Sequence, residues 1–188
     1  MMNSNVKIIG VGTYHPSKKV GNEFFIEHFK KKADRDITGF LQELGKKDRF
    51  FVEDVTKENA LTMAVEASRK ALENSGISVD QLDMIVFVSD TPEYVAPTNA
   101  LYINNILGAK NAHTVYDMNA NCVGMVVAMD QVSRVIKTDS KIKYALVVGS
   151  LFVSSIARDD DAFTYSAVAD AAAAVIFERA EETERIGF

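Results

Sequence analysis

Two mostly apolar runs, residues 82–89 and 144–149, constrain the fold of this chain most strongly. Both are rich in Val, Ile, Leu and Phe, and neither alternates with polar residues. A strand with one face in water shows such alternation, whereas a strand covered on both faces reads as a continuous apolar run. We therefore expect these two runs to be inner strands of a sheet with a layer on each side.

Helical and extended patterns alternate along the rest of the chain. Apolar residues recur at helical spacing after Thr56 and stop at Gly76, a second helix is predicted between Pro97 and Gly108, and a third follows Cys122. We expect the start of this third helix to be buried, because it is apolar. Further strands are predicted over residues 6–14, 113–118 and 169–177. This order predicts an α/β layered domain with a mostly parallel or mixed sheet.

The first third of the chain carries weaker signals. A turn at Pro16 is expected to lead into a helix capped by Asn22, and residues 34–54 are predicted to form a surface loop with one or two helical turns. Residues 184–188 resemble the beginning of another strand. No Gly-x-Gly-x-x-Gly or Walker sequence is present, so a nucleotide-binding function lacks its phosphate-binding loop.

Composition and charge exclude several functional classes. The formal net charge of −5 argues against nucleic acid as a partner, because phosphate binding needs a concentrated basic surface. No stretch is apolar for long enough to span a membrane, and residues 1–11 do not resemble a secretion signal, so we expect a cytoplasmic protein. A single cysteine excludes an internal disulfide and a cysteine-based zinc cluster, and no metal is expected.

That single cysteine, Cys122, lies where a predicted strand gives way to a predicted helix. A thiol in the first turn of a helix meets unpaired N–H groups and the positive end of the macrodipole, and both favour the nucleophilic thiolate. Free cysteines are also commonly buried as small hydrophobic residues. At this point both interpretations stay open.

The order of several segments resembles the N-terminal half of the β-ketoacyl-acyl-carrier-protein synthase III family, over essentially the whole chain. The strongest similarities are Cys122-Val123-Gly124 and residues 144–150. Weaker ones are residues 6–12, 44–49, 117–124 and 169–171. The resemblance implies the thiolase fold, a layered α-β-α arrangement in which residues 1–188 form one half and the other half is missing. It also implies an acyltransferase of fatty acid biosynthesis or related acyl-chain building, and a homodimer.

The resemblance further implies a mechanism in which Cys122 takes an acyl group from a thioester and a decarboxylating malonyl thioester then attacks it. The expected substrates are acyl-CoA or an acyl chain on acyl carrier protein, together with malonyl-acyl-carrier protein, and no cofactor is needed. Substrate-binding positions carried over from the family are Ala96, Asn121, Gly124 and Gly149. Asn121 is interpreted as a cap of the helix of Cys122, the alternative being that its amide faces the acyl thioester.

Several positions differ from the family pattern. Gly39 or Phe40, Glu43 and Ala162 replace residues that contact coenzyme A in the family, which weakens the expectation of a coenzyme A primer. Ala96 replaces a phenylalanine that caps the acyl pocket across the dimer, so a deeper pocket is predicted. A glycine-rich loop of the family is the alanine-rich run 169–173 here, which puts its usual shape in doubt.

The family's catalytic histidine and asparagine come from its C-terminal half, and no counterpart is visible in this chain. The three histidines, His15, His28 and His113, are interpreted as packing or surface residues. We therefore expect the chain alone to be unable to complete the condensation. Two other functions stay open, a hydroxymethylglutaryl-CoA synthase-like enzyme and a non-catalytic thiolase-fold partner subunit.

Overall fold

A computed structural model describes residues 5–180 of the chain. Its main element is a five-stranded mixed sheet in the order β1-β7-β6-β4-β5. The strands are β1 (Asn5–Tyr14), β4 (Met84–Val88), β5 (Thr114–Met118), β6 (Tyr144–Leu151) and β7 (Ala171–Ala180). β6 pairs in parallel with β4 and antiparallel with β7, β4 and β5 are parallel, and β1 is antiparallel to β7.

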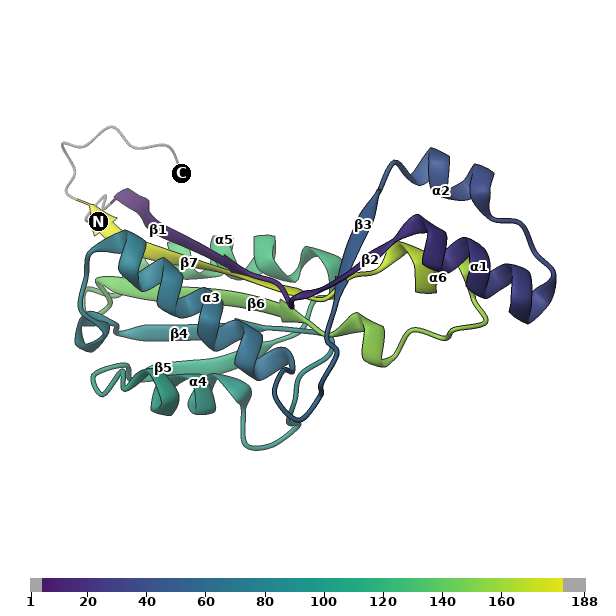
Figure 1. Cartoon of the computed structure of the whole chain (residues 1–188). Helices are drawn as coiled ribbons and strands as arrows, with labels where there is room; N and C mark the ends of the chain where they lie inside the picture. Colours follow the sequence, from purple (N-terminus) through teal and green to yellow (C-terminus); the bar gives the residue numbers. More distant parts are fainter. Residues whose placement is uncertain (1–4, 181–188) are drawn as a thin grey trace.

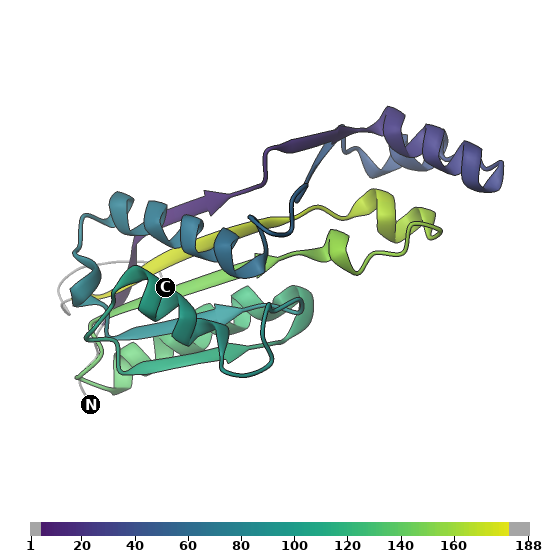
Figure 2. The same ribbon diagram turned by 60° about the horizontal axis from the view of Figure 1, so that its bottom comes forward.

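Helices cover the two faces of this sheet, as Figures 1 and 2 show. α3 (Ala60–Ser75) and α4 (Asn99–Leu107) pack on one face, and α5 (Gly124–Thr138) packs on the other. In β4 and β6 alternate residues join opposite cores, and all of Met84–Val88 is buried. The predicted α/β fold with a mixed sheet between helix layers is confirmed, and the two apolar runs are its inner strands.

A smaller lobe extends beyond one end of the sheet, on the right of Figure 1. It contains β2 (Lys18–Gly21), α1 (Asn22–Ala33), α2 (Thr38–Leu44), β3 (Asp48–Phe51) and α6 (Ala162–Ala167) around a separate apolar core. The described residues also form three single turns of 3-10 helix, η1 (Val79–Gln81), η2 (Asn121–Val123) and η3 (Val153–Ser155).

The lobe corrects two sequence-based predictions. Residues 34–54 are more than a surface loop, because they form α2 and also β3, which pairs with β2. Asn22 is not the helix cap, since Gly21 takes that position without a side-chain hydrogen bond. The Asn22 side chain instead accepts a hydrogen bond from Nη1 of Arg49.

Two buried charged residues hold together the lobe and its junction with the sheet. Arg49 is 1% exposed, its Nε donates to the Ser166 carbonyl at 2.6 Å, and its guanidinium lies over the Phe25 ring. Burial lowers the pKa of Arg49 from its usual value.

Asp170, immediately before β7, is the second of these residues and is fully buried. Its carboxylate accepts hydrogen bonds from the Val52 N–H and from both the N–H and the hydroxyl of Ser154. The alanine-rich run beginning at Ala171 continues as regular antiparallel strand against β6. The sequence left the shape of this segment in doubt. In the structure it is an extended strand that begins directly after Asp170, whose carboxylate is held by these hydrogen bonds.

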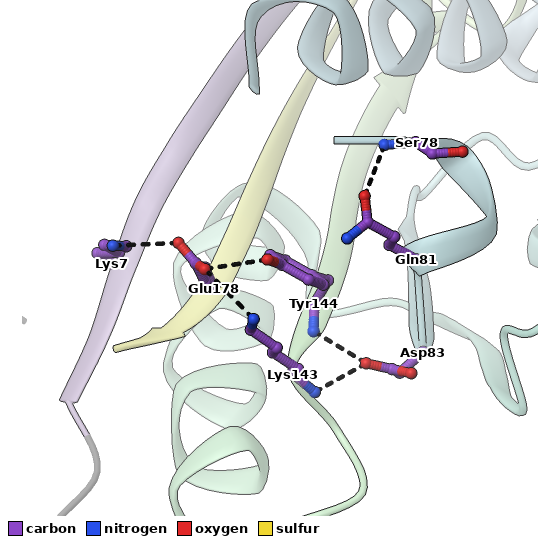
Figure 3. A network of polar contacts seen from close by, with 7 residues as sticks. All are labelled: Lys7, Ser78, Gln81, Asp83, Lys143, Tyr144 and Glu178. Carbon is purple, nitrogen blue, oxygen red and sulfur yellow. Dashed lines mark hydrogen bonds and ion pairs between the residues drawn. The ribbon is translucent and has the colours of Figure 1, made fainter. Parts of the chain in front are cut away.

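A polar network fixes the register at the opposite end of the sheet (Figure 3). Lys7, Glu178 and Tyr144 are paired across β1, β7 and β6. The Glu178 carboxylate lies 3.1 Å from the Lys7 ammonium and accepts from the Tyr144 hydroxyl at 3.0 Å. The Asp83 carboxylate accepts from the backbone N–H groups of Lys143 and Tyr144 (Figure 3). These contacts fix the pairing at this end of the sheet, and a bulge between Ile8 and Gly10 then shifts the register of β1 against β7.

The helix boundaries show one further correction. α3 begins at Ala60, after a capping box formed by Asn59 and Thr62, and ends at Gly76 as predicted. The start of α5 was expected to be buried, and this holds only in part: Gly124 is buried, but Val126 is 70% exposed. α5 meets the sheet through residues further along its length, namely Ala128, Val132 and Ile136.

The strand expected over residues 184–188 lies outside the described residues. Within residues 5–180, no helix is both long and apolar enough to cross a bilayer.

Candidate active site

Cys122 lies in the single turn η2, between the end of β5 and the beginning of α5. Its side chain is exposed, so the interpretation of this residue as a buried structural cysteine is wrong. The predicted position at a helix start is confirmed, since η2 leads directly into α5 at Gly124. The first N–H groups of a helix have no partner within it and bind anions or developing negative charge.

The backbone turns sharply at Asn121. This residue has a φ of +50°, in the left-handed region that Asn tolerates better than most residues because its short polar side chain can bond locally. Its N–H donates to Oδ1 of Asn119 at 3.0 Å. The Asn121 side chain caps neither η2 nor α5, so that prediction is wrong. Its backbone conformation, which sequence reasoning missed, directs the chain into the Cys122 turn.

Two glycines allow close packing beside the cysteine. A Cβ placed on Gly124 would come within 2.6 Å of Cγ1 of Val88, and one placed on Gly149 would come within 2.6 Å of the Met125 sulfur. Real Cβ atoms are never this close to such neighbours, so larger residues would move the start of α5 or the Met125 side chain. Both glycines thus determine how closely the Cys122 segment approaches β4 and β6.

A cavity of about 390 Å³ opens at Cys122. Its walls come from the ends of four strands and from the start of α5, and they are largely apolar. The lining residues are Thr13, Tyr14, His15, Val88, Ser89, Asp90, Asn121, Cys122, Met125, Gly149, Ser150, Leu151, Ala171, Ala172 and Ala173. Of the predicted site residues, the cavity brings together Cys122, Asn121 and Gly149, while Gly124 lies behind the wall, against Val88.

The sheet register explains why these residues meet. Thr13 is paired with Ala173, Ala173 with Gly149, and Gly149 with Val88, so one row of small or short side chains crosses four strands. Side chains alternate between the two faces of a strand, and this row lies on the α5 side. α5 starts near β4 and β6. Beyond its first turn, the side chains of this row are too small to fill the space over the sheet, and that space forms the cavity.

Ala96 is not part of this cavity. It is exposed in the loop between β4 and α4. Since the expected contact of Ala96 was with a second copy of the chain, its role stays a prediction.

The structure places His15 in the cavity wall, one residue after β1 ends. Its ring stacks on Phe50, with centroids 3.8 Å apart, and its Nδ1 lies 2.8 Å from the Pro16 carbonyl oxygen. The interpretation of this histidine as a packing or surface residue agrees with its exposed side chain and its stacking on Phe50, but its place in the cavity wall was not predicted. The sequence shows that His15 lies two residues after Thr13, but it does not show that β1 lies beside β7.

Tyr14, next to His15, is held by an acidic partner. Its hydroxyl donates to Oε1 of Glu58 at 2.5 Å, and this hydrogen bond, followed by burial, raises the pKa of Tyr14 to about 12. The phenol is therefore neutral at physiological pH. Among the described residues, no group of three or more His, Cys, Asp or Glu side chains could hold a metal ion.

Comparison with known proteins agrees with this geometry. The family described as 3-oxoacyl-[acyl-carrier-protein] synthase III matches residues 116–188, which include Cys122. The β-ketoacyl-[acyl-carrier-protein] synthase III of Clostridium acetobutylicum is 34% identical over 181 residues, which are 96% of this chain and 53% of that protein. The resemblance to β-ketoacyl-acyl-carrier-protein synthase III is confirmed.

Other relatives extend the comparison. The synthase III of Clostridium perfringens is 33% identical over 178 residues, covering 95% of this chain and 52% of that protein. The chain therefore spans about half the length of the curated synthase III relatives it matches.

Solved structures support the same fold. The crystal structure of 3-oxoacyl-[acyl-carrier-protein] synthase III from Aquifex aeolicus superposes with a TM-score of 0.84 at 29% identity, covering 95% of this chain and 55% of that chain. A 3-oxoacyl-(acyl-carrier protein) synthase from Burkholderia xenovorans gives a TM-score of 0.83 at 24% identity, over 96% of this chain and 50% of that chain, and supports the fold alone. The expected thiolase-like fold of the synthase III relatives is thus confirmed.

Proposed function

We propose that Cys122 is the acyl acceptor of a β-ketoacyl-acyl-carrier-protein synthase III-type condensing enzyme. The observation that carries this proposal is an exposed cysteine at a helix start that opens into a largely apolar cavity of about 390 Å³. A nucleophile with an apolar space beside it suits a reaction in which a hydrocarbon chain becomes covalently attached.

In the first step, the Cys122 thiolate attacks the carbonyl carbon of an acyl thioester. The new carbon–sulfur bond forms as the carbonyl oxygen takes up negative charge, and the carrier thiolate then leaves and takes up a proton. The backbone N–H of Cys122 is the group proposed to stabilise the charged oxygen, since the N–H of Asn121 already donates to Asn119 and that of Gly124 donates to the Asn121 carbonyl. The product is an acyl group linked to Cys122.

In the second step, we propose that a malonyl group on acyl carrier protein loses carbon dioxide and attacks the acyl-Cys122 carbonyl. A carbon–carbon bond forms and the cysteine thiolate is released. The names of the synthase III relatives support acyl carrier protein as the partner and fatty acid biosynthesis as the setting. We propose no metal or organic cofactor for either step, and the cytoplasmic location stays a prediction.

The proposed oligomer is a homodimer. β5 is an edge strand of the sheet, and all five of its residues are only partly buried. An edge strand offers unpaired backbone groups to a second strand, and a pair of identical edges forms a two-fold interface. Ala96 would then reach the acyl group of the partner chain and, being small, would permit long acyl groups.

Mass spectrometry of the full-length protein tests this function after incubation with acyl thioesters of increasing length. Acylation is expected at Cys122 with a preference for groups longer than acetyl, and Ala96→Phe should move that preference toward acetyl. A preference for acetyl that Ala96→Phe leaves unchanged would remove Ala96 from the proposal. A protein that shows no selective acylation would instead be a non-catalytic partner subunit.

A further inference from the structure

We propose that Lys70 and Asn74 of α3 close the outer edge of β1 to strand pairing with a second copy of the chain. The observation that carries this inference is a pair of hydrogen bonds from the helix to the edge strand. Nζ of Lys70 donates to the Thr13 carbonyl at 2.9 Å, and Nδ2 of Asn74 donates to the Val11 carbonyl at 2.8 Å. The inference rests on the proposed homodimer but not on the chemistry of Cys122.

β1 has the properties of an edge strand that pairs readily with other chains. It is ten residues long, contains no proline and lies at the end of the sheet opposite β5. The side chains of Ile8 and Val11 are 37% and 49% exposed. A long edge strand of this kind offers another strand both unpaired backbone groups and an apolar surface. We therefore expect the fold to contain a feature that prevents pairing at β1.

The proposed homodimer makes the state of this edge important. If two β5 edges meet across a two-fold axis, the strand order places β1 at each outer end of the assembly. A free β1 edge at both ends would let one dimer pair with the next, and such pairing has no natural end. Open-ended association of this kind produces fibres rather than a defined oligomer.

The two carbonyls that α3 contacts are the ones that an incoming strand would use. In an antiparallel pair, the N–H and C=O of one residue point to the same side of the strand, and that side alternates from residue to residue. Because the Val11 and Thr13 carbonyls accept from α3, they point away from β7. They are two residues apart, roughly 7 Å along the strand, which is the repeat of bonding positions along an edge. Two consecutive acceptor positions are thus already occupied.

Two glycines of β1 allow α3 to come close enough for these hydrogen bonds. Gly10 and Gly12 face the helix, and a Cβ added to either would lie within 2.3 Å of a carbonyl oxygen of α3. The helix therefore lies directly against the strand (Figures 1 and 2). Lys70 and Asn74 are four residues apart and lie on the same side of α3, so both side chains reach the edge.

Two further features support the closure. A bulge between Ile8 and Gly10 shifts the register of β1 just before the two contacted carbonyls, and a bulge interrupts the regular ladder that a further strand needs. The Lys70 ammonium also lies 5.4 Å from the centroid of the Tyr14 ring, a cation–π contact that holds it beside the strand. An incoming strand would have to displace both α3 side chains and remove the Lys70 charge from water.

The experiment measures the molar mass of the full-length protein by size-exclusion chromatography with light scattering over a range of concentrations. The parent is expected to keep the mass of a dimer. Lys70→Ala combined with Asn74→Ala should form species of roughly twice that mass or more, and their share should grow with concentration. Lys70→Arg combined with Asn74→Gln retains both donors and should behave as the parent does. Arg69→Ala is the matched control, because it removes the same charge from α3 and Arg69 is paired with Glu66 rather than with β1.

Amide hydrogen exchange of the peptide that contains residues 8–14 shows where the copies meet. The outward N–H groups of Val11 and Thr13 should exchange more slowly in the assemblies of the double alanine variant, because a second strand then protects them. Loss of structure would make these groups exchange faster. This measurement therefore separates strand pairing from unfolding.

A double alanine variant that keeps the mass of the parent at every concentration would overturn the proposal. Larger species would overturn it as well if exchange in residues 8–14 is not slowed, or if Arg69→Ala forms them equally. A monomeric parent would remove the proposed homodimer, and closure of β1 would then be judged by whether only the double alanine variant associates. Failure of acylation at Cys122 would remove the proposed function and leave the closed edge intact.

Discussion

The Asp117 carboxylate accepts two hydrogen bonds from Asn99, one from its backbone N–H at 2.7 Å and one from its side-chain amide at 2.9 Å. It accepts a third from the N–H of Ala100, also at 2.7 Å. Asn99 is fully buried, and its side chain bonds both backbone groups of Tyr94. The strand that leads to Cys122 is thus attached to the start of α4 and to the loop that carries Ala96.

This attachment predicts a large effect of Asp117→Asn on stability. The substitution keeps the size of the side chain but places an N–H₂ group against N–H donors, so the free energy of unfolding should fall by about 2 kcal/mol. Urea denaturation measures this change. Asp130→Asn is the matched control, because Asp130 forms an exposed ion pair with Arg134, and its effect on stability should be much smaller. Equal effects of the two substitutions would show that Asp117 has no special structural role.

Gly149→Ala should impair acylation more than stability. The new methyl group would displace Met125, whose side chain is flexible and lines the cavity, so the cavity becomes smaller and the acylation rate should fall several-fold. Met125→Ala in the same chain should restore much of the rate. Gly39→Ala, at a glycine with no neighbour within 4 Å of an added Cβ, should leave the rate unchanged. A Gly149→Ala protein with the parent rate would contradict this account of the cavity wall.

The left-handed backbone of Asn121 predicts that glycine gives a more stable protein than alanine at this position, the reverse of the usual order. Alanine ordinarily stabilises a chain relative to glycine, but at a φ of +50° its Cβ is strained. Asn121→Gly should therefore be more stable to urea than Asn121→Ala by about 1 kcal/mol, although both remove the side chain. If Asn121→Ala is the more stable variant, the strained turn before Cys122 does not exist.

Tyr14 predicts a loss of stability at high pH. Its pKa is raised to about 12 in the folded protein from 10.0, by the hydrogen bond to Glu58 and then by burial. The stabilisation is complete below pH 10 and is lost as the pH rises through 12, because the folded state holds the phenol proton more tightly. Unfolding free energies measured across this interval should fall less steeply for Tyr14→Phe than for the parent. Identical slopes would show that Tyr14 titrates alike in the folded and unfolded chains.

Much of the layered fold could be predicted from local patterns. The runs that became β4 and β6 lack polar alternation because both of their faces are covered, and Gly76 and Gly108 end their helices with the positive φ that glycine readily adopts. The short strand β3 was missed because its four residues include a charged residue, Arg49, whose burial depends on partners far along the chain. Sequence patterns do not reveal hydrogen-bond partners that lie so far along the chain from a buried charge.

The candidate site could be predicted only in part. Cys122 was visible because the change from strand to helix at a lone cysteine is a local signal. His15 was not, because its place in the same cavity depends on β1 lying beside β7, and that pairing joins residues about 160 positions apart. The exposure of Val126 near the start of α5 was also missed, since an apolar sequence does not show which of its side chains lie against a neighbour.

The most direct test of the central claim is peptide mass spectrometry of the full-length protein after incubation with octanoyl pantetheine thioester. The account predicts an octanoyl adduct on the peptide that contains Cys122, and no adduct on that peptide in Cys122→Ala. An adduct that persists in Cys122→Ala, or a folded parent protein that is never acylated at Cys122, would contradict the assignment of this cysteine as the acyl acceptor.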